Sequence, residues 1–101
     1  MKQIEYKQEA RENLIQIREY ISRDSIYYAN KTVKEIIEKT KYLSMFPYMG
    51  RKVPEYNNTN LREIIYKSYR ILYKANSNIY ILTIFHHSRD ILNSINISTK
   101  I

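Results

Sequence analysis

The main change in the spacing of apolar residues along this chain falls near residue 47, and it restricts the fold more than any other feature. Before it, apolar residues recur every three or four positions in two stretches, which is the period of an amphipathic helix. The first stretch runs from about Gln8 to Arg23, and the second follows the N-cap candidates Asp24 and Ser25. The link between them is so short that we expect an antiparallel helical hairpin. Its apolar stripes are Ala10, Leu14, Ile17 and Ile21 in the first helix and Ala29, Val33, Ile36, Thr40 and Leu43 in the second.

Strand signals replace helix signals after the breakers Pro47, Gly50 and Pro54 and the polar loop 57–60. Three runs rich in Ile, Tyr and Leu follow, and their short links predict an antiparallel meander. We therefore expect an α+β fold in one domain spanning residues 1–101: an N-terminal strand, the helical hairpin, a three-stranded meander that completes one sheet, and a short C-terminal helix or tail. The expected strands are Gln3 to Tyr6, Leu61 to Lys67, Tyr69 to Ala75 and Ile79 to His87.

Strand alternation divides the meander into two faces. If Tyr69, Ile71 and Tyr73 face one side, then Arg70, Leu72 and Lys74 face the other. One face packs on the helical hairpin, so we expect the other to be open and charged. This open face is the predicted working surface.

Composition excludes several classes of protein. The chain has no cysteine, which removes disulfides, thiolate nucleophiles and cysteine-ligated zinc. No apolar run reaches the roughly 18 residues that span a bilayer, and the N-terminus lacks a signal-peptide core, so we expect a cytoplasmic protein with no membrane partner. The net charge is +7, and residues 47–101 carry eight Lys and Arg against three Asp and Glu. Such a field favours a polyanion or an acidic protein, although it also serves solubility.

The second half also holds residue types suited to cleaving RNA without a metal. That reaction needs a base for the 2′-OH, an acid for the departing 5′ oxygen and fixed positive charge on the phosphate. Glu55 is a candidate base, a histidine the acid, and guanidinium groups the clamp. The candidates are Glu55, Arg62, Arg70, His86 and His87.

Each candidate also has a structural interpretation. From spacing alone, the favoured interpretation of Glu55 is a solvated loop carboxylate or a salt-bridge partner of Arg51 or Lys52, ahead of a catalytic group. Alternation sends His86 and His87 to opposite faces, so at most one joins a site, and a paired-histidine metal centre is rejected. We expect no metal and no cofactor. Tyrosines of the strands are suited to stacking on bases or to packing within the sheet: Tyr66, Tyr69, Tyr73 and Tyr80.

The order of elements, together with the segments GRKVPE, LREIIYKSYRILYK and ILTIFHHSRD, resembles the RelE/ParE superfamily of type II toxin-antitoxin toxins. The resemblance covers nearly the whole chain. It implies a growth-arresting toxin whose active surface is masked by a cognate antitoxin in a hetero-oligomer. RelE-like members cleave mRNA on the ribosome, whereas ParE-like members inhibit DNA gyrase without nuclease activity.

The residues favour the endoribonuclease branch at this point, with the gyrase inhibitor as the alternative and a non-catalytic RNA-binding module as a third possibility. The chain is similar to YoeB-type mRNA interferases at Glu55 and Arg70, but Ser88 stands where those nucleases have a terminal tyrosine. The resemblance implies that Arg70 stabilises the phosphate, Arg62 assists it, Glu55 is the base and His86 or His87 the acid. Further expected contacts to RNA or target are Arg51, Lys52, Lys74 and Arg89.

Overall fold

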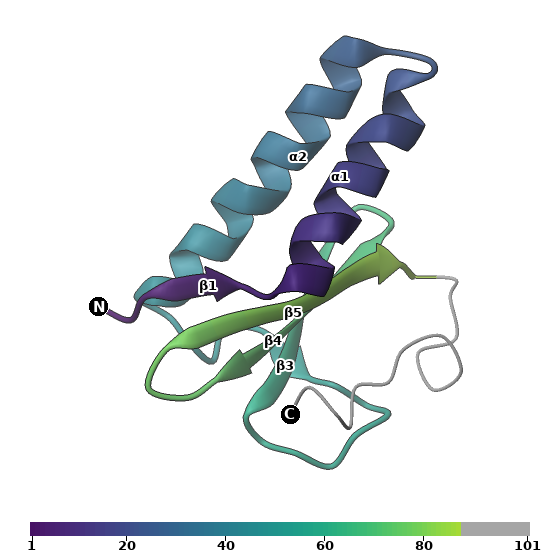
Figure 1. Cartoon of the computed structure of the whole chain (residues 1–101). Coiled ribbons are helices and arrows are strands. Elements are labelled where there is room, and N and C mark those ends of the chain that lie inside the picture. Colours follow the sequence, from purple (N-terminus) through teal and green to yellow (C-terminus); the bar gives the residue numbers. More distant parts are fainter. Residues whose placement is uncertain (88–101) are drawn as a thin grey trace.

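The computed structural model describes residues 1–87 of the 101-residue chain. A helical hairpin packs on one mixed sheet, which has the strand order β1-β5-β4-β3-β2 (Figure 1). β1 runs parallel to β5, and the other neighbours are antiparallel. The expected α+β architecture is confirmed, and the expected C-terminal helix or tail lies outside the described residues. The elements are β1 (Ile4–Tyr6), α1 (Gln8–Ser22), α2 (Ile26–Lys41), the 3-10 helix η1 (Tyr42–Ser44), β2 (Arg51–Lys52), β3 (Leu61–Tyr66), β4 (Tyr69–Ala75) and β5 (Ile79–His86).

The hairpin forms where the periodicity places it. Ser25 caps α2, since its hydroxyl accepts a hydrogen bond from the Tyr28 amide at 3.1 Å. The two helices lie side by side, α1 over β5, and their connection projects beyond the sheet (Figure 1). Within the described residues, neither helix combines the length and apolar content needed to cross a bilayer. Ala10, Ile17 and Ile36 of the hairpin, together with Leu43 of η1, enter the main core.

The face of the sheet away from the helices is not open, which corrects the sequence prediction. Leu72, Leu82 and Phe85 are buried there, beneath Val53 and Tyr56 of the segment between β2 and β3. Alternation put Leu72 on this face correctly, but an apolar side chain there needs cover from water. The segment that supplies the cover has no periodicity, so its position does not follow from pattern.

The β3–β4 hairpin fixes which side chains share that second face. Lys67 has φ 50°, the left-handed conformation that two-residue hairpin turns require. With only Lys67 and Ser68 in the turn, Tyr66 pairs with Tyr69, Ile65 with Arg70 and Glu63 with Leu72. Glu63 and Arg70 are therefore diagonal neighbours on one face of the sheet.

Gly50 and Tyr73 anchor the chain between η1 and β2. The Tyr73 hydroxyl accepts a hydrogen bond from the Gly50 amide at 3.0 Å and donates one to the Pro47 carbonyl at 2.8 Å. Tyr73 is fully buried, and burial raises the pKa of its hydroxyl. Gly50 is required for its lack of a side chain, because an added Cβ would lie 2.6 Å from the Glu63 carbonyl oxygen and 2.7 Å from the Tyr73 hydroxyl.

Replacing Gly50 with alanine should therefore destabilise the fold. We expect a loss of about 1–3 kcal/mol in the free energy of unfolding, because the new methyl group meets backbone that cannot turn away. Urea denaturation followed by circular dichroism measures it, with Asn57→Ala in the exposed loop as the matched control. Equal stability of the two variants would contradict the close approach at Gly50.

Candidate functional site

The second face of the sheet is built around a buried carboxylate that the sequence prediction missed. The Glu63 side chain is 0 % exposed and accepts hydrogen bonds from two arginines. Arg51 Nε donates to Oε2 at 2.8 Å, and Arg70 Nε donates to Oε1 at 2.8 Å. A buried charge is tolerated only when paired in this manner.

Arg70 also holds Glu55. Its Nη1 and Nη2 donate to the two carboxylate oxygens of Glu55, each at 2.9 Å, and Nη2 contacts Glu63 as well. The hydrogen bond from Arg70 holds the pKa of Glu55 below its usual value, and the same bond raises the pKa of Arg70. We call Arg51, Glu55, Glu63 and Arg70 the ion cluster; it contains two positive and two negative charges and is neutral.

The expectation that Arg70 lies on an open face is wrong. Its side chain is only 10 % exposed, and it lies over the Phe85 ring with the guanidinium carbon 5.5 Å from the ring centre. The loop that buries Leu72 also delivers Glu55 to the guanidinium. Arg70 is thus a cross-link between strand and loop, and its charge is already matched.

Arg62 lies on the opposite face of the sheet from Arg70. It is registered with Tyr73, whereas Arg70 is registered with Ile65. Its guanidinium donates to the carbonyl oxygens of Thr59 at 2.9 Å and Gly50 at 3.2 Å, and it lies over the Tyr48 ring. The structure therefore brings Glu55 and Arg70 together and leaves Arg62 apart from them.

The two histidines lie together at the end of β5, contrary to the expected separation. Their ring centres are 4.8 Å apart, and both side chains are exposed. Alternation fails here because β5 ends at His86, while His87 is in a turn whose amide donates to the Ser68 carbonyl at 2.7 Å. Arg89 and Ser88 lie outside the described residues.

The strand tyrosines take packing and hydrogen-bonding positions. Tyr66 donates to the Glu35 carboxylate of α2, and burial together with that contact raises its pKa to about 12. Tyr69 packs against the main core and meets the His86 ring edge-on. Tyr80 packs on the apolar cluster that contains Leu72, Leu82 and Phe85. It lies beneath Lys7, whose ammonium is 4.7 Å from the ring centre.

Positive charge in excess of the ion cluster comes from four other residues. Residues 47–87 contain six Lys and Arg but only two carboxylates, Glu55 and Glu63, and both are held by arginines of the cluster. Lys52 is exposed on β2, and Lys74 lines a shallow hollow with Lys7 and Tyr80. The surplus therefore comes from Lys52, Arg62, Lys67 and Lys74.

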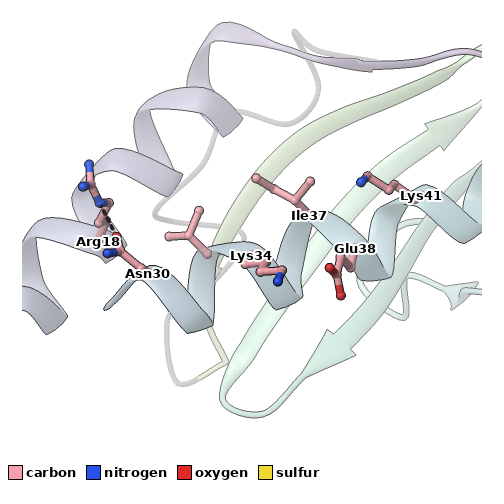
Figure 2. Close-up of a pocket in the computed structure, with 7 residues that line it drawn as sticks. Arg18, Asn30, Lys34, Ile37, Glu38 and Lys41 are labelled. Carbon is pink, nitrogen blue, oxygen red and sulfur yellow. Dashed lines mark hydrogen bonds between the residues drawn. The ribbon is translucent and has the colours of Figure 1, made fainter. Parts of the chain in front are cut away.

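A larger hollow, of about 460 Å³, lies along α2 and not at the ion cluster. Figure 2 shows Lys34, Ile37, Glu38 and Lys41 on successive turns of α2 at this hollow. Arg18 reaches across from α1, and its Nε donates to the Asn30 side chain at 2.9 Å. Val33, expected in the buried stripe, lines this hollow. Three cations surround it against one carboxylate, so it too suits an acidic partner.

The described residues hold no group of three or more His, Asp and Glu side chains arranged for a metal ion. The interactions that the structure shows at this site are those of the ion cluster, which cross-links β2, β4 and the loop through Glu63 and Glu55. Glu63 was the residue that sequence reasoning missed. The signal was present, because a two-residue turn at 67–68 places Glu63 diagonal to Arg70.

Comparison with known proteins agrees with this fold. The chain resembles a solved structure described as "Chromosomal ParDE TA system from P. aeruginosa", with 21% sequence identity and a TM-score of 0.71 over 85% of this chain and 96% of that chain. That likeness defines the fold class as ParE-like. A search of curated proteins found no match.

The family follows from the sequence itself. Residues 4–91 match the model of the family described as ParE toxin of type II toxin-antitoxin system, parDE. The chain belongs to this toxin family, and membership implies a cognate antitoxin as its partner.

Removing Arg70 should damage stability, contrary to the expectation from an open face. Arg70→Ala leaves the buried Glu63 with Arg51 alone, and breaking such a pair costs about 3–5 kcal/mol. Arg51→Ala is the matched control, since it removes the same charge from the same carboxylate but at a side chain that is 63% exposed. Urea denaturation should show the larger loss for Arg70→Ala; similar small losses would contradict its buried role.

Acid should weaken the hold on the covering loop. Because the folded-state pKa of Glu55 is lowered, its contribution to stability is complete above the unfolded value of about 4.3 and is lost as the pH falls through the folded value. Glu55→Gln should therefore lose less stability than the parent chain between pH 5 and the acid limit. Thermal melts of both chains across about pH 2–6 measure the difference, and parallel pH curves would contradict it.

Proposed function

We propose that this chain is a cytoplasmic toxin that arrests growth by binding DNA gyrase, without cutting RNA, when its antitoxin no longer masks it. Membership of the ParE toxin family supports the toxin assignment. The hydrogen bonds that hold Arg70 to carboxylates carry the choice of mechanism. Gyrase binding thereby replaces ribosome-dependent mRNA cleavage as the favoured activity.

Metal-free RNA cleavage requires a positive group free to meet the phosphate in the transition state. Arg70 makes four hydrogen bonds to carboxylates, using four of its five N–H donors. An RNA phosphate would have to displace Glu55 and oppose the buried Glu63. The cluster therefore serves better as a structural cross-link than as a phosphate clamp.

The expected base and acid are also poorly placed. Glu55 has a lowered pKa, which makes its carboxylate a weaker base. Arg62, the expected assistant, lies on the other face of the sheet. Catalysis by these groups would therefore require Arg62, Glu55 and Arg70 to be rearranged.

Binding is supported by the charge and by the apolar surface. The four surplus cations of residues 47–87 favour encounter with an acidic surface. Large apolar side chains in the segment after α2 are also exposed, which is typical of a surface that contacts another protein. They are Tyr42, Met45, Phe46, Tyr48 and Met49.

Controlled expression distinguishes the mechanisms. We expect impaired supercoiling by gyrase and gyrase-linked DNA breaks, with mRNA ends at ribosomal A sites unchanged from uninduced cells. Mapping of mRNA ends and a supercoiling assay with purified chain give the two readouts. New A-site cuts with normal supercoiling would overturn the proposal, as would salt-dependent RNA binding without growth arrest.

A substitution at Glu55 separates a structural carboxylate from a catalytic one. Glu55→Gln keeps the size of the side chain and one acceptor for Arg70, so we expect toxicity within about threefold of the parent at equal soluble amounts. Loss of a general base would instead reduce cleavage by about 10²–10⁴-fold. Growth after induction, normalised to the soluble toxin, makes the comparison.

A further inference from the structure

Four large apolar side chains lie on the surface directly after α2, where that helix ends beside β1 (Figure 1). They belong to Tyr42, Met45, Phe46 and Tyr48, and each is between 52% and 62% exposed. The amides of Met45 and Phe46 both donate to the Tyr42 carbonyl, at 3.2 Å and 2.9 Å. This helical turn places the three side chains on one side of the backbone. We call the four side chains the aromatic ridge.

The backbone that carries the aromatic ridge is anchored at both ends. In η1, the Ser44 carbonyl accepts from the Lys2 amide at 3.1 Å, and the Ser44 hydroxyl donates to the Lys2 carbonyl at 2.6 Å. After the turn, the buried Tyr73 hydroxyl holds both the Pro47 carbonyl and the Gly50 amide. The ridge cannot turn inward without breaking these bonds. A surface preorganised in this manner loses little conformational entropy on binding.

The charge around the aromatic ridge is positive. Residues 39–54 contain no Asp or Glu, and their cations are Lys39, Lys41, Arg51 and Lys52. Arg51 is bonded to the buried Glu63, whereas Lys41 directly precedes the ridge and is exposed. The Arg62 guanidinium carbon lies 5.0 Å from the ring centre of Tyr48. Apolar side chains among cations are complementary to an apolar protein surface bordered by carboxylates.

The tip of the helical hairpin exposes apolar side chains of similar size but differs in charge. Ile26, Tyr27 and Tyr28 are 59% to 69% exposed there. Residues 18–31 contain three Lys and Arg against two Asp and Glu, so the tip is nearly neutral. It therefore has little preference for an acidic partner. Size and charge together favour such a partner at the aromatic ridge.

The same features distinguish between possible occupants of the aromatic ridge. A second copy of the chain would bring the same cations, and each chain carries a net charge of +7. The phosphate backbone of a DNA duplex offers no apolar surface to Met45 and Phe46. A folded protein target can contact all four side chains at once, since they come from residues 42–48 and their backbone is fixed.

We infer that the aromatic ridge is the surface through which the chain contacts gyrase: its four side chains pack against an apolar area of the enzyme, and Lys41 and Arg62 face carboxylates beside that area. The inference rests on the proposed function, because it takes gyrase as the target. It adds the contact residues of the toxin and the chemistry of the gyrase surface that receives them.

A truncation in the aromatic ridge tests the apolar contact. Phe46→Ala should weaken binding to purified DNA gyrase by about tenfold or more, because buried aromatic side chains at the centre of an interface carry much of the binding energy. The concentration that halves supercoiling should rise by the same factor. Tyr28→Ala is the matched control, since it removes an aromatic ring of similar exposure at the hairpin tip, and should stay within about twofold of the parent.

A charge reversal tests the predicted carboxylates. Lys41→Glu should weaken gyrase binding by about tenfold at low salt, and the difference from the parent should shrink as salt rises from about 50 mM to about 500 mM, because salt screens exposed charges. Lys31→Glu is the matched control, because it makes the same change at an exposed position on the same helix. We expect it to bind within about twofold of the parent.

The outcomes separate this inference from the proposed function. Gyrase inhibition by Phe46→Ala and Lys41→Glu at parental strength would overturn the inference and leave the gyrase function intact; absence of gyrase binding by the parent chain would overturn both. Equal losses in the ridge and control variants would also overturn the inference. Circular dichroism and thermal melts verify folding, and Lys41→Glu provides the test if Phe46→Ala does not fold.

Discussion

The buried carboxylate of Glu63 is the constraint that the second face of the sheet depends on. A charge with no exposed surface cannot remain there without partners, so Arg70 from β4 and Arg51 from β2 must both reach it. Arg70 then has donors left over, and these draw Glu55 and its loop down over Leu72 and Phe85. The Glu63 carboxylate is thereby the point at which β4, the edge strand β2 and the loop that carries Glu55 are joined.

This arrangement explains how a sheet with an arginine in its centre can be covered on both faces. Pairing satisfies the guanidinium, and the loop that supplies its second partner also shields the apolar side chains around it. Replacing such a network by apolar residues of similar size is often neutral for stability, whereas removing one member is not. In this structure the hydrogen bonds from Arg70 to Glu55 tie the loop to the sheet.

Periodicity predicted most of the fold, because helix and strand periods depend on near neighbours in sequence. The cap at Ser25, the stripe through Ala29 and Ile36, and the opposite faces of Ile71 and Leu72 followed from that pattern. The cover over Leu72 did not, since the segment 53–60 has no period and its place is set by Glu55 meeting Arg70. The spacing of apolar residues does not predict which segments that are distant in the sequence pair with each other.

The candidate site was harder to predict for a related reason. From residue types alone we predicted that Arg70 binds phosphate, because an arginine in the centre of an open sheet face would have no other partner. Counting the carboxylates argues otherwise: residues 47–87 contain only Glu55 and Glu63, and both are used to neutralise two arginines. The other Lys and Arg of this range lie outside the cluster. Lys52 is on the edge strand β2, Arg62 on β3 and Lys74 on the central strand β4, while Lys67 is in the β3–β4 turn with its ammonium 4.0 Å from the Glu35 carboxylate. The proposed binding of an acidic protein target therefore relies on surface outside the cluster, namely the exposed apolar side chains after α2 and the cations that the cluster does not use.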